Sequence, residues 1–481
     1  MAVVLGVDSS TQSTKVVACD LDSGAVVAEG SAPHPPTAPP VSEQDPRAWW
    51  DALTAAVGAL GAVRNEVVAM AVAGQQHGLV LLDAAGDPVR PAKLWNDTTS
   101  AAEAAALVDV LGADGWAQAC GSVPLASFTI AKLAWVVAHE PDALGRAQRV
   151  MLPHDYLTWR LTGAHVTDRA TPRAPGGSAH RLDLSARSPS RRLPLPTGSS
   201  RRSRPCSDRP SRPAASSPSA AAALGLPAEV VVRAGTGDNM AAALGLGLRP
   251  GDVAMSLGST SGTVYSVAGV GTNPDSSGHV AGFADAAGGH LPLVCTLNAT
   301  RVTDTVAGWL GTDAAGLSAL ACAAPAGFDG VILVPYFDGE RTPNRPDATG
   351  SFLGLRTTTG REALARAAHD GVLCGLYAGL DALRSAGVSA DGRIHLIGGG
   401  ARSAAYRQRC ADLAGESIVV PQIGEAVAQG AAVQAAAVAG GVGIGEVVAR
   451  WASDAAITID PVDPEGGAAV RAGYTEVGLF G

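Results

Sequence analysis

The chain has 481 residues, which is enough for two or more domains and a large core. It is 47% hydrophobic and 16% charged, and its formal net charge of -9 argues against a general nucleic-acid-binding protein. No run of about 20 apolar residues could span a membrane, and no secretory signal is recognisable. Seven cysteines without a Cys-x-x-Cys pair indicate neither a disulfide framework nor a zinc site. We therefore expect a cytoplasmic α/β protein that contacts neither nucleic acid nor a membrane.

Two polar hairpins, about half a chain apart, indicate two related halves. An apolar run at residues 3–7 and a second predicted strand at residues 15–19 flank the hydroxyl-rich turn 8–14. The same arrangement returns at residues 253–267, where two apolar runs flank a Gly/Ser/Thr turn. Short strands separated by such turns are typical of β-hairpins, and recurrence of a pattern indicates an internal repeat.

Strand and helix patterns alternate between and after the hairpins. Asp45 followed by Pro46 predicts the start of a helix, and residues 67–72 predict a buried strand. In the second half, residues 361–386 predict a long helix and residues 394–397 a strand that enters a glycine turn. Alternation of this kind predicts an α/β class with covered sheets and a boundary near residue 245.

The first hairpin turn offers backbone N–H groups and hydroxyls around one carboxylate, Asp8. Such a turn suits phosphate oxygens, and a carboxylate suits Mg²⁺ or its water ligands. A polar surface turn is the alternative, and the matching turn at residues 258–262 favours the phosphate reading.

Two glycine-containing turns stand where a strand gives way to a helix. Asp238, in the turn 235–239, is well placed for a general base, although this turn taken alone favours an ordinary helix N-cap. The glycines at 398–400 permit close approach of a ligand, and a tight strand–helix turn is the alternative. Neither a dinucleotide-binding Gly-x-Gly-x-x-Gly fingerprint nor a Walker A motif is present.

Further polar groups follow strand ends in the first half. Residues 75–78 read Gln-Gln-His-Gly and residues 95–97 read Trp-Asn-Asp, a set that suits a polyhydroxylated ligand. A structural histidine is the alternative. The loop 336–343 is dense in polar and aromatic residues, and a solvated turn with an internal Glu–Arg pair is its alternative.

Taken in order, these segments resemble the FGGY family of carbohydrate kinases, and most closely its members that act on D-xylulose. The similarity runs over most of the chain, at residues 6–14, 43–50, 74–78, 94–97, 155–163, 235–239, 257–262, 336–343, 398–403 and 424–430. Each motif alone is weak, whereas their joint order is specific.

The resemblance implies an actin-like ATPase fold, with two ribonuclease-H-like domains (1–245, sugar-binding, and 246–481, nucleotide-binding) and a cleft between them. It implies ATP-dependent phosphorylation of D-xylulose at O5 with Mg²⁺, and leaves a homodimer open. Asp238 would be the general base and Asp8 would help hold Mg²⁺. The remaining implied roles are sugar binding by Gln76 and His77 with Trp95 and Asp97 nearby, phosphate binding by Thr11, Gln12, Ser13, Thr14, Ser259 and Thr260, and adenosine contact by Gly399, Gly400, Ala401 and Gln429.

One block departs from the family. Residues 170–218 contain ten Arg, two Asp and no Phe, Trp, Tyr or Lys, a formal charge of +8. Where the family continues with a Gly-Asp-Ala-Ser-Gly-Thr-like run, residues 170–175 read Ala-Thr-Pro-Arg-Ala-Pro. Deleting one G from GGC GAC GCC TCG GGC ACC, one choice of synonymous codons, encodes that sequence. We interpret 170–220 as a frameshifted segment that returns to frame before Ala221; a natural disordered insertion is the alternative.

Two other functions stay open. One is a kinase for another ketose or polyol of the same family. The other is a catalytically impaired protein of the actin-like fold that binds nucleotide without phosphorylating a sugar.

Overall fold

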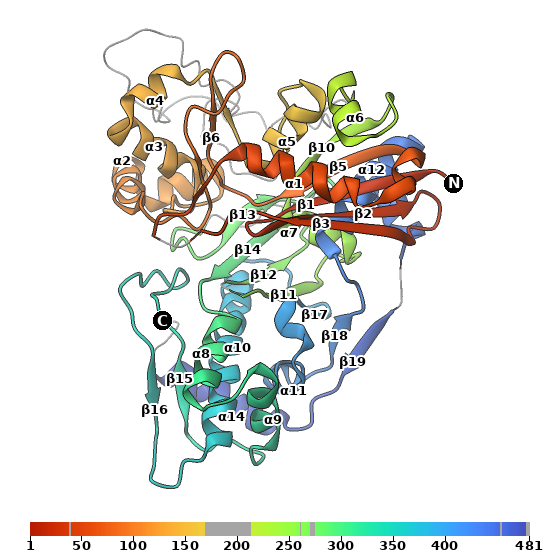
Figure 1. Cartoon of the computed structure of the whole chain (residues 1–481). Helices are drawn as coiled ribbons and strands as arrows, with labels where there is room; N and C mark the ends of the chain where they lie inside the picture. The colour runs from red at the N-terminus through yellow and green to blue at the C-terminus, as the bar shows by residue number, and fades with distance from the viewer. Residues whose placement is uncertain (38–39, 169–212, 260, 270–274, 453–454, 478–481) are drawn as a thin grey trace. The chain divides into compact units, whose positions relative to one another are not determined.

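The computed structural model describes residues 1–37, 40–168, 213–259, 261–269, 275–452 and 455–477 (Figure 1). The chain divides into two compact units. The first comprises Met1–Leu248, Phe283–Gly289 and Gly424–Ser453, and the second comprises Arg249–Gly282, His290–Ile423 and Asp454–Gly481. The first unit therefore includes residues 424–453, which a consecutive division at residue 245 places in the second half.

The first unit is built on a six-stranded sheet. In spatial order its strands are β3 (Val26–Pro33), β2 (Ser13–Asp20), β1 (Val3–Ser9), β5 (Val67–Gly74), β10 (Val231–Gly237) and β9 (Ala214–Ala215). Strands β1, β5 and β10 are parallel, and β2 returns antiparallel to β1. Every residue of β1 is buried, as expected for a central strand covered on both faces. Two short pairs, β4 (Glu43–Gln44) with β7 (Ala92–Lys93) and β6 (Val80–Leu82) with β8 (Arg149–Met151), lie outside this sheet.

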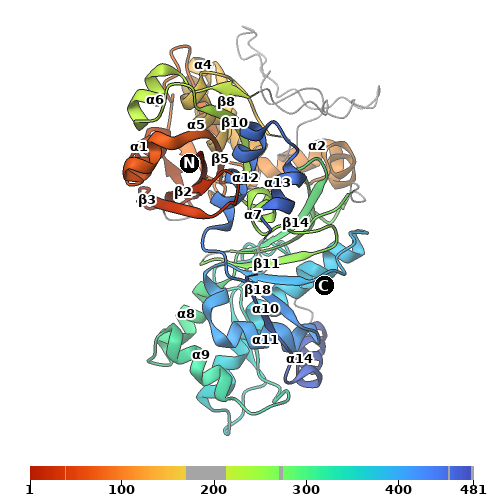
Figure 2. The ribbon, with the colours of Figure 1, turned by 90° about the vertical axis from the view of Figure 1, so that its right-hand side faces the viewer.

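Helices cover both faces of this sheet. One face packs on α1 (Pro46–Gly58), α5 (Pro153–Thr162) and α6 (Pro218–Leu224), and the other packs on α7 (Asp238–Gly245), α12 (Ala426–Gly440) and α13 (Ile444–Arg450) (Figure 2). The remaining helices of the unit are η1 (Gly61–Glu66), α2 (Ala101–Cys120), α3 (Thr129–His139) and α4 (Pro141–Arg146).

Glycine allows α12 to approach very closely. A Cβ atom on Gly6 of β1 would meet the Ala428 carbonyl oxygen of α12, and one on Gly430 of α12 would meet the Ala241 carbonyl oxygen of α7. Helix α12 is therefore held between the sheet and α7 by close backbone contact rather than by large side chains.

The second unit is built on a seven-stranded sheet. Its strands, in spatial order, are β13 (Ala281–Ala284), β14 (His290–Thr296), β12 (Gly262–Ser266), β11 (Val253–Leu257), β17 (Ile394–Ile397), β18 (Ile418–Pro421) and β19 (Ala456–Ile459). A short pair, β15 (Ile332–Val334) with β16 (Ser351–Leu353), accompanies it.

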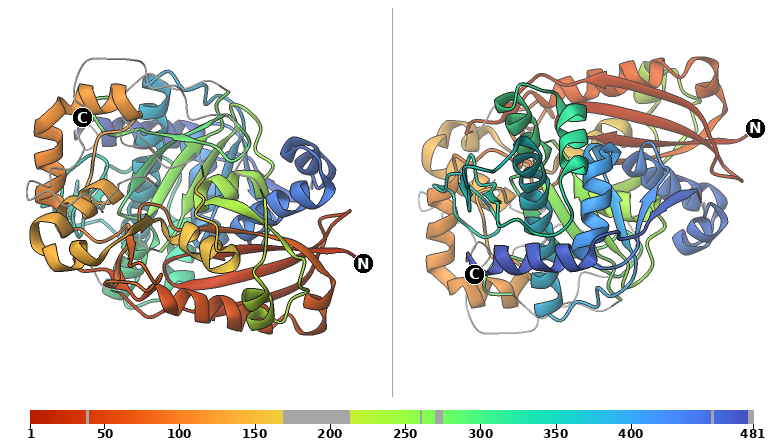
Figure 3. Two further views of the ribbon diagram at one scale, coloured as in Figure 1. Left: turned by 90° about the horizontal axis from the view of Figure 1, so that it is seen from above. Right: turned by 90° about the horizontal axis from the view of Figure 1, so that it is seen from below.

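Five helices share one hydrophobic core with the strands of this unit, and Figure 3 shows the ribbon from above and from below. They are α8 (Thr300–Trp309), α9 (Ala314–Ala323), α10 (Arg361–Ser385), α11 (Ala404–Ala414) and α14 (Pro464–Glu476), and the short η3 (Gly399–Arg402) precedes α11. Inside this layer, buried Arg409 pairs with Asp370 at 2.8 Å and with Asp412 at 2.9 Å.

The two sheets share one plan, which confirms the prediction of two related halves. In each, an antiparallel hairpin (β1/β2 or β11/β12) is extended on one side by an antiparallel strand and on the other by two parallel strands, β5 and β10 or β17 and β18. The predicted helix at Pro46 is present, and its Asp45 cap accepts the Arg47 N–H at 2.9 Å.

Within the described ranges, no single helix is long and apolar enough to cross a membrane. Two bent pairs, α8 with α9 and α12 with α13, pass that test by length and composition only.

Candidate active site

In the first unit, the carboxyl ends of three parallel strands bring together polar segments that are far apart in sequence. Asp8 lies at the end of β1, Gln75 follows β5, and Asp238 follows β10. Since β5 pairs with both β1 and β10, these ends share one edge of the sheet. Open α/β sheets bind ligands at this edge.

Asp238 is the first residue of α7, and Gly237 takes the N-cap position without a side-chain bond. The reading of Asp238 as an ordinary N-cap is therefore wrong. Its carboxylate accepts hydrogen bonds from the backbone N–H (2.8 Å) and side-chain amide (2.9 Å) of Asn239. The side chain stays partly exposed, yet the surrounding protein atoms desolvate it and raise its pKa to about 6. A carboxylate with that pKa can both accept a proton and release it near neutral pH.

Asp8 is almost fully buried and accepts the Ser10 hydroxyl at 2.6 Å. Burial, which outweighs this hydrogen bond, raises the pKa of Asp8 to about 7, and the negative charge of Asp238 adds to the shift. Two acidic groups thus act on one another at the same sheet edge. Two neighbouring carboxyl groups favour the binding of a cation at this edge.

The hairpin turn beside Asp8 divides into exposed and buried parts. Gln12 is exposed, and Thr11 and Ser13 are partly exposed. Thr14 is fully buried, and its hydroxyl lies 2.8 Å from Nε2 of His34. The predicted phosphate-binding set is thus accessible at residues 11–13, whereas the hydroxyl of Thr14 is engaged inside the protein.

Gln76 and His77 reach the same place from the turn after β5. The Gln76 side chain packs on Gly237, where a Cβ would meet it at 2.5 Å, and its carbonyl oxygen accepts from the Asn239 amide at 3.4 Å. His77 has φ 62°, and no other described non-glycine residue has a positive φ. Its ring stacks on Phe128 at 4.4 Å and also contacts Phe283. A strained backbone held by such packing is typical of a functional position.

Trp95 and Asp97 have different surroundings. The Trp95 indole N–H donates to the Thr11 hydroxyl at 2.9 Å, so the predicted sugar-side and phosphate-side segments meet. Asp97 is fully buried, and its carboxylate accepts from Thr99, from the Ser42 backbone at 2.9 Å and from Lys93 at 3.2 Å. Its partners are protein groups, so its role here is to hold the loop that carries Trp95.

Sequence reasoning missed a buried histidine and two carboxylates. His154, at the start of α5, is fully buried, and its Nε2 lies 3.4 Å from Asp155 and 3.7 Å from Asp168. Burial opposes its positive charge, but these two carboxylates outweigh burial and raise the pKa of His154 to about 9. Asn239 was also given no role, although its adjacency to Asp238 was a usable signal.

In the second unit, the second hairpin turn and the glycine turn lie together. Ser259 is exposed, and its carbonyl accepts the Arg301 N–H at the start of α8. A Cβ on Gly400 would meet Leu257 at 2.7 Å and Thr300 at 2.8 Å. Gly399 is exposed and Ala401 is buried. Thr260 lies outside the described residues.

Gln429 lies elsewhere. It belongs to α12 of the first unit, near the Lys15–Glu425 ion pair of 2.9 Å. The structure does not gather it with residues 399–401 in one unit.

The loop 336–343 is not a solvated turn. Glu340 is 2% exposed and accepts from the Leu297 N–H at 2.7 Å and the Asn298 amide at 2.8 Å. It therefore fastens this loop to the end of β14.

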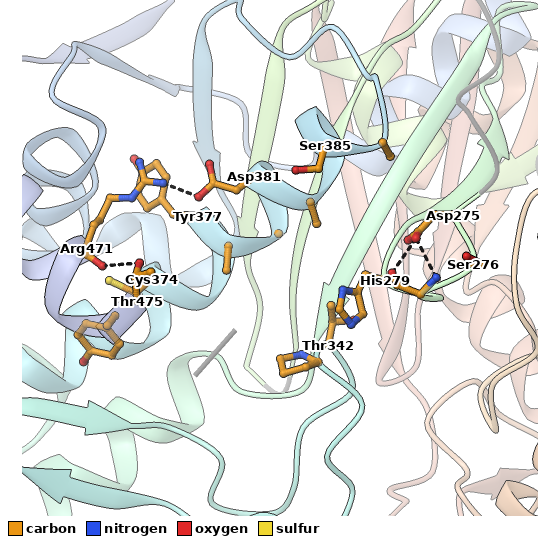
Figure 4. Close-up of a pocket in the computed structure, with 17 residues that line it drawn as sticks. Asp275, Ser276, His279, Thr342, Cys374, Tyr377, Asp381, Ser385, Arg471 and Thr475 are labelled. Carbon is orange, nitrogen blue, oxygen red and sulfur yellow. Dashed lines mark hydrogen bonds and ion pairs between the residues drawn. The ribbon is translucent and has the colours of Figure 1, made fainter. Parts of the chain in front are cut away.

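A cavity of about 600 Å³ in the second unit contains none of the predicted site residues (Figure 4). Arg471 of α14 lies over the Tyr377 ring and pairs with Asp381 of α10 at 2.6 Å. The charges of Arg471 and Asp381 therefore neutralise one another on the cavity wall.

The residues at Asp8 fit a magnesium ion. Mg²⁺ in phosphoryl-transfer sites takes one or two carboxylates and completes its coordination with water and substrate phosphates. Among the described residues no group of three or more His, Cys, Asp or Glu could hold a metal. Asp8, buried and electrostatically strained beside Asp238, is the suitable ligand.

Comparison with known proteins places these features in a family. Residues 3–245 match the N-terminal domain of the FGGY family of carbohydrate kinases, and residues 253–439 match its C-terminal domain. A xylulose kinase of Streptomyces coelicolor is 46% identical, over 96% of this chain and 93% of its own. One from Streptomyces rubiginosus is 44% identical over the same shares. The solved structure of a xylulose kinase from Bifidobacterium adolescentis is 38% identical, with a TM-score of 0.78 over 99% of both chains.

The fold and the matches together define a carbohydrate kinase with the actin-like ATPase fold. The chain belongs to the FGGY family.

Proposed function

We propose that this chain transfers the γ-phosphoryl group of ATP to O5 of D-xylulose. The observation that carries the chemistry is Asp238, a partly exposed carboxylate at the start of α7 whose pKa burial raises to about 6. The choice of sugar is supported by the xylulose kinases that are 46% and 44% identical.

Asp238 is the general base of the proposal. It accepts the proton of the sugar hydroxyl as that oxygen attacks the γ-phosphorus, while the bond to the leaving ADP oxygen breaks. The Asn239 amide orients this carboxylate. Asp8 would hold a magnesium ion, which would neutralise charge on the ATP phosphates. Because phosphoryl transfer depends on positioning and charge neutralisation, fixed donors and one oriented base are sufficient.

The sugar is held by Gln76 and His77 beside Asp238, with Trp95 closing one side. Gln76 offers both a donor and an acceptor to neighbouring hydroxyls, and the strained backbone at His77 directs its ring. Asp97 acts through the Trp95 loop.

The nucleotide is held by the residues that the resemblance to the family implies. Thr11, Gln12 and Ser13 from the first hairpin, with Ser259 and Thr260 from the second, hold phosphate oxygens. Gly399, Gly400 and Ala401 contact the adenosine, as does Gln429. We place the enzyme in the cytoplasm, where ATP is available, and a homodimer is the assembly to test.

The proposal is tested by ADP release with D-xylulose, beside D-ribulose, L-ribulose, D-fructose, glycerol and D-gluconate as competing substrates. D-Xylulose should give the highest kcat/KM, and Asp238→Asn should lower kcat about 100- to 10,000-fold while the fold persists. Retained turnover in Asp238→Asn would remove Asp238 as the base. A preference for another sugar would assign the chain to another ketose or polyol.

The assay compares two proteins, the 481-residue chain and a version with residues 170–220 restored to frame. We propose that the restored version is the more active one. Resequencing of the source DNA decides the frameshift, because an intact reading frame for this sequence would exclude it.

A further inference from the structure

His154 is the least expected charged group near the sheet edge. It sits at the second position of α5, fully buried, beside Gly74 at the end of β5. A Cβ on Gly74 would lie 3.4 Å from the His154 Cβ and 2.9 Å from the Ser9 carbonyl oxygen. A side chain at Gly74 would therefore crowd the Ser9 carbonyl and touch the Cβ of His154 at van der Waals distance, which places His154 directly beside the strand ends.

The charged groups with the largest effect on His154 are acidic: Asp155, Asp168 and Asp238. A buried positive charge is costly unless it is paired, and here two carboxylates lie within 4 Å of Nε2. These two carboxylates thus stabilise the buried imidazolium of His154.

Asp168 connects this histidine to the strand that carries the proposed base. Its Oδ2 accepts hydrogen bonds from the Thr236 hydroxyl and the Gly237 backbone N–H, both at 3.2 Å. These are the last two residues of β10, and Asp238 follows directly. The same oxygen faces Nε2 of His154 at 3.7 Å.

We propose that His154 is a positioning residue: its imidazolium holds Asp168 against the end of β10, and Asp168 fixes the Gly237 peptide that aims Asp238. The inference rests on the proposed role of Asp238 as base. His154 touches neither substrate in this account and acts only through Asp168.

Hydrogen–deuterium exchange tests the positioning without any turnover. The Gly237 N–H should exchange at least tenfold faster in His154→Gln and in Asp168→Asn than in the unmodified chain, because its acceptor is displaced or weakened. Asp168→Asn is isosteric, so it carries the test if His154→Gln does not fold.

His369→Gln is the matched control. His369 is 2% exposed in α10 of the second unit, and its Nδ1 lies 2.8 Å from the Ala365 carbonyl oxygen. The same substitution of a buried histidine should lower the melting temperature and leave the Gly237 exchange and kcat unchanged.

Kinetics give the second readout. His154→Gln should lower kcat about 10- to 100-fold and change the KM for ATP less than about twofold, because misplacing a base by a fraction of an ångström affects the transition state most. The double variant with Asp168→Asn should lose no more than the more damaging single variant, since both act along one path.

The outcomes separate the two proposals. Faster exchange at Gly237 with no sugar phosphorylation by the unmodified or in-frame protein would support the positioning and refute the function. Loss of turnover in Asp238→Asn alone, with unchanged exchange and kcat in His154→Gln, would overturn the positioning role and leave the function intact.

Discussion

The activity should fall as the pH is lowered through about 6. Only the ionised form of Asp238 can accept the sugar proton, and burial raises the pKa of this carboxyl to about 6. Titration of one such group leaves ~90% of it ionised at one pH unit above its pKa and ~10% at one unit below. The pKa of the free protein is reported by kcat/KM, so we expect kcat/KM for the sugar to fall about tenfold between pH 7 and pH 5. An aspartate with its ordinary pKa of about 3.9 would lose less than ~10% over that range.

The measurement is sugar phosphate formed in stopped reactions, which avoids coupling enzymes with their own pH dependence. Asp8 has its pKa raised to about 7 by burial, so it could give an acid limb of its own. A limb due to Asp8 should move to lower pH as Mg²⁺ is increased, because the ion competes with the proton, whereas the limb due to Asp238 should stay near 6 at saturating Mg²⁺. A kcat/KM for the sugar that stays level down to pH 5 would refute the assignment of this base.

Three substitutions test the packing and the site. Gly430→Ala should lower the stability by about 1–3 kcal/mol, because its Cβ would meet the Ala241 carbonyl oxygen; an unchanged melting temperature would contradict that close approach. Arg409→Leu should cost about 3–5 kcal/mol in denaturant unfolding, since it leaves two buried aspartates without their cation. Trp95→Phe removes the donor to the Thr11 hydroxyl and should raise the KM for the sugar several-fold with a stability loss of about 1 kcal/mol; an unchanged KM would separate Trp95 from the sugar.

Local signals predicted much of the fold. The Asp45–Pro46 start of α1, the two hairpins and the strand at 394–397 depend on neighbouring residues, and the structure confirms them. The turn that carries Asp238 was also singled out locally, because a strand followed by Gly-Asp-Asn places a carboxylate at a helix start, whereas the role of Asp238 as base came from the resemblance to the family. Such features are set by backbone preferences within a few residues.

Long-range packing could not be predicted in that way. α12 is almost entirely Ala, Gly and Val and is buried nearly all round, so it has no apolar stripe to indicate its partner. Its assignment to the first unit depends on the bare backbone at Gly6 and Gly430. Thr14 is the second residue of β2, and only the pairing of β2 with β3 shows that its hydroxyl faces His34. The proposed positioning role of His154 depends on Asp168, which lies near it only in the folded chain.

Strand β10 links the departure from the family to the proposed chemistry. Asp168, just before the altered block, accepts the Gly237 N–H at the carboxyl end of β10. After the block, β9 pairs with β10 at Val231 and Val232. The Ser217 hydroxyl caps α6, and its backbone N–H donates to the Leu161 carbonyl at 2.7 Å. Regular packing of this kind favours a return to the family's frame before about residue 213, earlier than Ala221. Both ends of the block are thus fastened to the strand that carries Asp238. An altered sequence between them can therefore disturb the base through the backbone of β10 without contacting a substrate.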